Sequence, residues 1–110
     1  MKAAALILAL SASSAQAQFL TGNELLDRLN GSTVQQVNAV GYITGVADAE
    51  LGTLWCPPPS ISARQIVDLT KRTLDAVPEK RHENASSFVM AAVRMTWPCE
   101  SKPKAKGAML

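Results

Sequence analysis

A repeated helix-start signal constrains this sequence more than any other feature. Residues 21–24, 32–35 and 62–65 each begin with Thr or Ser and end with Glu or Gln. In such a capping box, the hydroxyl accepts a hydrogen bond from a first-turn backbone N–H, and the Glu or Gln side chain accepts one from the cap residue. Asn84 offers a fourth N-cap. Apolar residues at helical spacing follow each signal, so the sequence predicts four helices.

Stop signals bound three of these helices. Gly31 follows the first, Gly52 lies just beyond the second, and Pro78 ends the third. The pattern favours helices over residues 21–30, 32–50 and 62–77 and one more from Asn84 onward, with short connections between them. The predicted fold class is all-α, a small four-helix bundle.

The second helix is apolar around most of its circumference, which is typical of a central helix. Gly41 and Gly45 are four residues apart within it. That spacing lets another backbone approach closely. We expect this approach to be tight packing within the chain rather than dimerisation.

The first 17 residues read as a cleaved signal peptide. Lys2 precedes an apolar run over residues 3–10, and residues 15–17 form an A-x-A cleavage site before Gln18. The apolar run is shorter than the roughly 20 residues that a spanning helix needs. We therefore expect a periplasmic protein without integral membrane association.

Charge divides the remaining chain into a domain and a tail. Residues 18–100 hold seven Lys or Arg and nine Asp or Glu, whereas the tail, residues 101–110, adds three lysines. We expect residues 18–100 to form one helical domain and the basic tail to be disordered. Nucleic-acid binders usually carry a clustered basic face, and the domain shows none, so we expect no nucleic-acid partner.

Cys56 and Cys99 are the only cysteines, 43 positions apart. An even count in an exported chain indicates a disulfide. A metal site or a nucleophilic cysteine is the alternative, but His82 is the only histidine. Because Trp55 and Trp97 lie close to the two cysteines in sequence, a bridge would bring both rings to one end of the core. An aromatic plug is the expected result.

Motifs that carry chemistry are missing from the sequence. It contains no phosphate-binding glycine loop, no H-E-x-x-H and no G-x-S-x-G. We expect no catalytic residues, no metal site and no cofactor, and hence a protein that acts by binding and not as an enzyme.

The ordered motifs resemble those of the Rap/Tai immunity proteins of type VI secretion. Residues 41–49 (GYITGVADA) are similar to the family's G-Y-x-x-G-hydrophobic-x-D-A core. Further similar segments follow the family's order: residues 22–26 (GNELL), 55–57 (WCP), 78–81 (PEKR) and 98–99 (PC). The resemblance covers roughly residues 20–99.

The resemblance implies a small helical periplasmic protein that binds and occludes a cognate cell-wall amidase toxin, often as a homodimer. One departure is visible. Members often carry an extra cysteine pair in the first two helices, where this chain has residues such as Leu29 and Ala39. A second hypothesis is a small, disulfide-bonded periplasmic stress chaperone. That hypothesis requires apolar surface to become exposed when the pH falls. The sequence has one histidine and so offers no evident group to trigger such a change.

Two surfaces are candidates for contact with a partner. The first is the connector between the third and fourth helices, which is rich in charge and consists of Glu79, Lys80, Arg81, His82 and Glu83. The second is a face of the fourth helix with residue types enriched at interfaces, namely Met90, Arg94 and Trp97. If a second copy covers the helix face, the connector stays free, so we favour the connector as the toxin contact.

Overall fold

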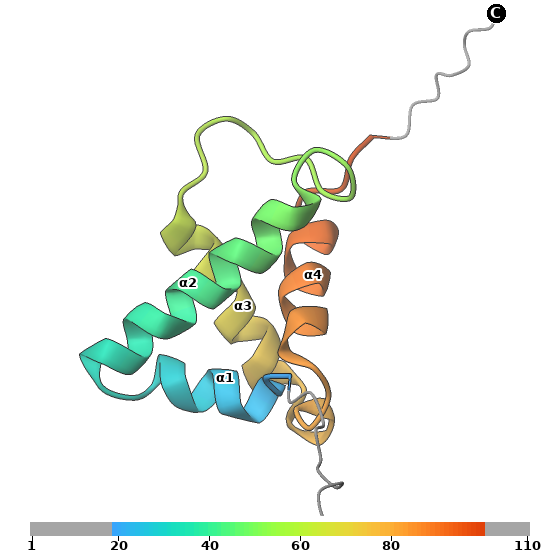
Figure 1. Ribbon diagram of the computed structural model, residues 1–110. Coiled ribbons are helices and arrows are strands. Elements are labelled where there is room, and N and C mark those ends of the chain that lie inside the picture. The colour runs from blue at the N-terminus through green and yellow to red at the C-terminus, as the bar shows by residue number, and fades with distance from the viewer. Residues whose placement is uncertain (1–18, 101–110) are drawn as a thin grey trace, which may run out of the picture.

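The computed structural model describes residues 19–100 and contains four α-helices (Figure 1). The connections are short except between α2 and α3, where residues 51–62 form a longer loop, unlike the short connection that the sequence predicts. The elements in chain order are α1 (Gly22–Leu29), α2 (Thr33–Glu50), α3 (Ala63–Ala76), the 3-10 helix η2 (Pro78–Lys80) and α4 (Ala85–Thr96). Within the described range only isolated β-bridges occur besides these helices. The prediction of an all-α four-helix fold is confirmed, while the predicted signal peptide and basic tail lie outside the described residues.

The three capping boxes form as the sequence predicts. At α1, the Thr21 N–H donates to Glu24 Oε1 at 2.9 Å and the Glu24 N–H donates to Thr21 Oγ1 at 3.2 Å. The boxes at Ser32 and Ser62 are formed in the same reciprocal way. Asn84 occupies the N-cap of α4, but its side chain makes no capping hydrogen bond. The local sequence therefore determines where each helix begins. In three of the four helices it also supplies the side-chain hydrogen bonds that cap the first turn.

The helices surround one apolar core. In Figure 1, α2 crosses the front of the molecule, α3 lies behind it, α4 stands at one side and α1 runs along the base. Every pair of α-helices is in contact. The buried apolar residues come from all four helices and from the loop after α2: Leu25, Ala39, Ile43, Ala47, Trp55, Ile66, Leu74, Ala85, Phe88, Val89, Ala92 and Val93. The buried Thr70 satisfies its hydroxyl by donating to the Ile66 carbonyl at 2.9 Å.

The start of α1 is fixed to the connector that precedes α4. The Gly22 N–H donates to the Glu83 carbonyl at 2.9 Å, and the Asn23 N–H donates to the Arg81 carbonyl at 2.8 Å. Gly22 is buried, and a Cβ at this position would lie 3.0 Å from the Arg81 carbonyl oxygen and 2.9 Å from Phe88 Cε2. The close approach of the two backbones thus requires glycine here. Free N–H groups at the start of α1 are satisfied by a segment about 60 residues away in sequence.

One face of α2 points away from the rest of the chain, which differs from expectation. Ala39, Ile43 and Ala47 are buried on the opposite face. Gly41 and Gly45 are exposed, and a Cβ built on either would meet nothing within 4 Å among the described residues. The expectation that these glycines pack tightly within the chain was wrong. Because α2 is apolar around most of its circumference, its sequence does not show which face turns inward. In the structure the face with Ala39, Ile43 and Ala47 packs in the core.

None of the helices in residues 19–100 is both long enough and apolar enough to cross a membrane.

Candidate partner-binding surfaces

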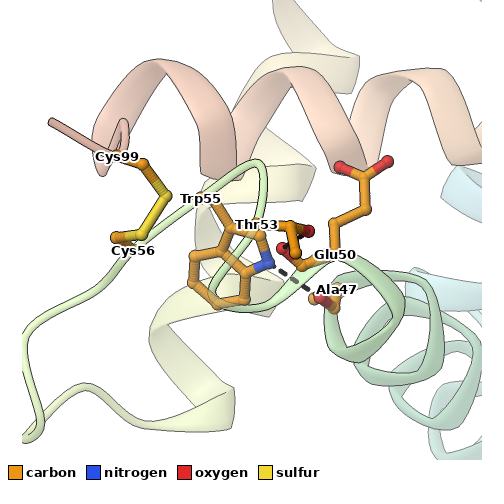
Figure 2. The surroundings of a disulfide bond; sticks show 6 residues. All are labelled: Ala47, Glu50, Thr53, Trp55, Cys56 and Cys99. Carbon is orange, nitrogen blue, oxygen red and sulfur yellow. Dashed lines mark hydrogen bonds between the residues drawn. A yellow bond between two sulfur atoms is a disulfide. The ribbon is translucent and has the colours of Figure 1, made fainter. Parts of the chain in front are cut away.

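The predicted disulfide joins the loop after α2 to the end of α4. Cys56 and Cys99 are bridged with their Cα atoms 4.7 Å apart (Figure 2). A backbone hydrogen bond from the Cys56 N–H to the Trp97 carbonyl, 2.8 Å long, runs beside the bridge. The disulfide prediction is confirmed. The bridge ties the start of the proline-rich loop, residues 57–59, to the end of α4.

Trp55 closes this end of the core. Its side chain is 2% exposed, and its indole N–H donates to the Ala47 carbonyl at 2.7 Å, as Figure 2 shows. Trp97 is half-buried beside it, with the two ring centroids 5.9 Å apart. The expected aromatic plug is present. Trp55 is buried in the core, whereas Trp97 remains partly accessible.

An open groove lies next to the plug, and sequence reasoning did not anticipate it. The groove has a volume of about 600 Å³ and runs between the end of α2 and the start of α3. Its lining includes Asp48, Trp55, Pro58 and Ile66. It arises because the proline-rich loop arches away from the helices in Figure 1 before it reaches α3. Only the tertiary path of that loop creates the groove, so no local motif signals it.

The candidate face on α4 is partly engaged by α2. Arg94 forms a bidentate ion pair with Glu50, with Nε to Oε1 at 3.0 Å and Nη2 to Oε2 at 2.8 Å. The hydrogen bond to Glu50 raises the pKa of the Arg94 guanidinium above its ordinary value. Arg94 Nη2 also donates to Met90 Sδ at 3.5 Å. Met90, Arg94 and Trp97 therefore each have a neighbour within the chain, and a role in partner binding stays a prediction.

Sequence reasoning missed Glu50 as the partner of Arg94. The two residues are 44 positions apart and come from different helices. Glu50 is the last residue of α2, so its carboxylate lies where the arginine of α4 can reach it. A single acidic residue at a helix end carries no local signal for such a partner.

The charged connector is anchored at its middle and exposed around that anchor. Arg81 is half-buried, with Nη1 donating to the Leu74 carbonyl at 2.8 Å and Nε donating to Asn23 Oδ1 at 3.2 Å. The other candidate residues, Glu79, Lys80, His82 and Glu83, are exposed. The structure thus gives Arg81 an internal role that sequence reasoning did not assign. It brings Glu79, Lys80, His82 and Glu83 together on one short rigid turn.

No group of three or more His, Cys, Asp or Glu residues within the described part of the chain is arranged to hold a metal ion.

Comparison with known proteins gives a family. A search of curated proteins gave no match. The family model for Rap1a immunity proteins matches residues 21–99, from the N-cap of α1 to the second cysteine of the disulfide. The match spans all four helices and both candidate surfaces. This chain therefore belongs to the Rap1a immunity protein family.

Proposed function

We propose that this protein is exported to the periplasm, where it binds and blocks a peptidoglycan amidase toxin of type VI secretion. The observation that carries the proposal is the family match over residues 21–99, which covers nearly the whole described domain. Inhibition is stoichiometric, and the protein itself performs no catalysis. A stable helical scaffold that presents a fixed surface suits this mode of action, because a preorganised partner loses little conformational freedom on binding.

The connector is the segment that we assign to the toxin. Its backbone is held by the hydrogen bonds from Gly22 and Asn23, and its centre is held by the Arg81 side chain. Lys80, His82 and Glu83 project from this support and are exposed. Loops positioned by a rigid scaffold commonly carry binding residues. Charged and polar groups in such a segment can pair with the polar groups of an amidase cleft.

The test of toxin binding is titration calorimetry of the mature protein against its cognate amidase. We expect saturable binding with loss of amidase activity on peptidoglycan. Lys80→Glu should weaken binding at least tenfold, about 1.4 kcal/mol, while the fold stays intact because exposed substitutions usually change stability by less than about 0.5 kcal/mol. Arg81 is left unchanged in this experiment, since its side chain supports the connector.

Arg64→Glu is the matched control. It makes the same change of charge at a side chain that is 81% exposed near the start of α3. Equal affinities for wild type and Lys80→Glu would exclude the connector from the contact. No inhibition by the wild type would contradict the proposed function. Capture of many unfolded proteins without saturation would favour the chaperone hypothesis instead.

Export is tested separately by the intact mass of the protein recovered from the periplasm. We expect a chain that begins at Gln18, because residues 15–17 form the cleavage signature. A stable periplasmic form that retains residues 1–17, or a protein confined to the cytoplasm, would contradict the localisation.

A further inference from the structure

A second groove lies between α3 and α4, and it shares no lining residue with the groove beside the tryptophan plug. We call it the α3–α4 groove. Its volume is about 560 Å³, and most of its lining is apolar, with Leu69 and Val77 on one side and Phe88 and Met95 on the other. Met95 is 81% exposed. The groove therefore presents apolar surface to solvent.

The charged residues that line the α3–α4 groove are both basic. They are Arg72 in α3 and Lys80 in η2, and both are exposed. Neither side chain forms an ion pair with another residue in the range 19–100. An apolar groove with unneutralised cations at its margin attracts a partner that is both apolar and acidic.

The ion pairs along α3 show that Arg72 is an exception. Asp68 lies four residues from both Arg64 and Arg72, yet its carboxylate pairs with Arg64 at 3.7 Å. Lys71 pairs with Asp75 at 3.1 Å. Of the three basic residues in α3, the one without an ion pair in the described structure is the one that lines the groove.

The positions of the two cations indicate the shape of the partner. Arg72 lies about one turn before the end of α3, whereas Lys80 lies beyond that end, in η2. A ligand with one anionic group neutralises one cation and leaves the other without a partner. An elongated ligand with several carboxylates can neutralise both.

The wall of the groove on α4 suits a helix. Phe88, Ala91, Ala92 and Met95 recur there at intervals of three and four residues. The alanines leave a depression between the two larger side chains, and helices pack by setting the ridges of one into the grooves of another. Ala76 makes the opposite wall shallow in the same way. A third helix can therefore lie along α3 and α4.

We propose that the α3–α4 groove is a docking site for an amphipathic helix of another protein, one with an apolar stripe bordered by carboxylates. The stripe covers Val77, Ala91 and Met95, as in other helix-in-groove complexes, and the carboxylates pair with Arg72 and Lys80. Exposed ion pairs contribute little affinity, so the apolar contact supplies the affinity and the charges select acidic helices. Binding of this helix does not depend on the proposed amidase contact.

Fluorescence anisotropy of a labelled synthetic peptide with the mature protein tests the proposal. The probe has about 20 residues, because isolated helices shorter than about 12–15 residues are marginal in water. It carries a leucine stripe bordered by glutamates, and a second peptide has lysines in place of the glutamates. We expect saturable binding of the glutamate peptide, with a dissociation constant at least tenfold lower than that of the lysine peptide. Added salt should raise this constant.

Two variants test whether the peptide occupies the groove. Arg72→Glu reverses a charge at the margin, and Met95→Glu introduces a carboxylate into the apolar wall. Each should raise the dissociation constant of the glutamate peptide at least tenfold. Arg64→Glu and Ser87→Glu are the matched controls, because both positions are exposed on the same two helices and neither lines the groove. They should leave the constant unchanged. Lys80 is kept in every variant, since it also belongs to the connector.

Circular dichroism verifies that each variant keeps its helices. Absence of saturable binding, or equal affinity for the two peptides, would overturn the inference. So would a dissociation constant that is the same in wild type, Arg72→Glu and Met95→Glu, because the peptide would then bind elsewhere. Dodecanoate is the probe for an acyl-chain ligand. Dodecanoate binding that is lost in Arg72→Glu, without any binding of the glutamate peptide, would assign the groove to an anionic amphiphile instead.

Discussion

At the scale of single residues, Trp55 combines two roles, one in the core and one at the end of α2. The last carbonyls of an α-helix have no partner within the helix. At the end of α2, the Ala47 carbonyl accepts from the buried Trp55 indole, and the Glu50 carbonyl accepts from the Thr53 and Leu54 N–H groups, each at 3.0 Å. The turn that permits this has Gly52 at φ +84°. One aromatic side chain thus fills the core and caps a helix.

Replacing Trp55 by Phe tests how much the hydrogen bond from the indole to the Ala47 carbonyl contributes to stability. Phenylalanine keeps an apolar ring but has no N–H, so the Ala47 carbonyl loses its donor within the core. An unsatisfied buried group costs about 1–3 kcal/mol, and we expect the free energy of unfolding in urea to fall by at least that amount, because the smaller ring also leaves a gap in the core. Circular dichroism is the suitable probe, since the substitution alters tryptophan fluorescence.

Trp97→Phe is the comparison for Trp55→Phe. Trp97 is only half-buried, and none of its hydrogen bonds in the described structure involves the indole N–H. It should lose less stability. Equal losses for the two variants would mean that ring volume, and not the capping hydrogen bond, accounts for the effect.

At the scale of elements, the sequence determines helix boundaries well and helix faces less well. Thr21, Ser32 and Ser62 begin their helices as predicted because a capping box is satisfied within four residues. The inward face of α2 was not predictable, since both of its sides are apolar and the choice depends on α1, α3 and α4. For the same reason the ion pair of Arg94 with Glu50 required the tertiary structure.

Asn84 shows the limit of local capping rules. It stands at the N-cap of α4, yet the strand-like bridge between Thr21 and Asn84 engages the backbone there, and the Ala85 N–H donates to the Leu20 carbonyl at 2.8 Å. The backbone of another segment thus satisfies an N–H at the start of α4. The capping rule predicted the N-cap position of α4. It did not predict that the Leu20 carbonyl accepts the hydrogen bond from the Ala85 N–H.

Alanine substitution at two N-caps should separate these cases. Ser62→Ala removes the hydroxyl that accepts from the Gln65 N–H at 3.3 Å, and we expect a loss of about 1 kcal/mol. Asn84→Ala should cost distinctly less, because its side chain makes no capping hydrogen bond. Urea denaturation of both variants measures the difference. A larger loss of stability for Asn84→Ala than for Ser62→Ala would contradict this explanation, because it would mean that the Asn84 side chain does stabilise the start of α4.

At the scale of the whole molecule, the disulfide is the main covalent constraint on a small core. It closes a loop of 43 residues that contains the proline-rich segment, α3, η2 and α4. The chain-entropy treatment assigns about 4 kcal/mol to a loop of this length. Small domains are commonly stable by only about 5–15 kcal/mol. The pairing was predictable because the chain has only two cysteines, whereas the groove beside it was not.

Reduction should therefore lower the melting temperature strongly. We expect a stability loss of about 4 kcal/mol when Cys56 and Cys99 are reduced or both replaced by Ser. Thermal unfolding with and without reductant measures it. Thiol titration of unfolded, unreduced protein should detect no free thiol from these two residues. Two free thiols, or melting that is indifferent to reductant, would contradict the stabilising role.

The contact between the start of α1 and the connector has a consequence for the order of folding. Gly22 and Asn23 are among the first domain residues to be synthesised, but their hydrogen-bond partners, Glu83 and Arg81, follow about 60 residues later. Loop-closure entropy must be overcome before such distant contacts can form. α1 can therefore become helical early and yet be secured only late. A nascent chain that ends before Arg81 lacks both this contact and the disulfide, so the domain must complete its fold after nearly all of its residues have emerged.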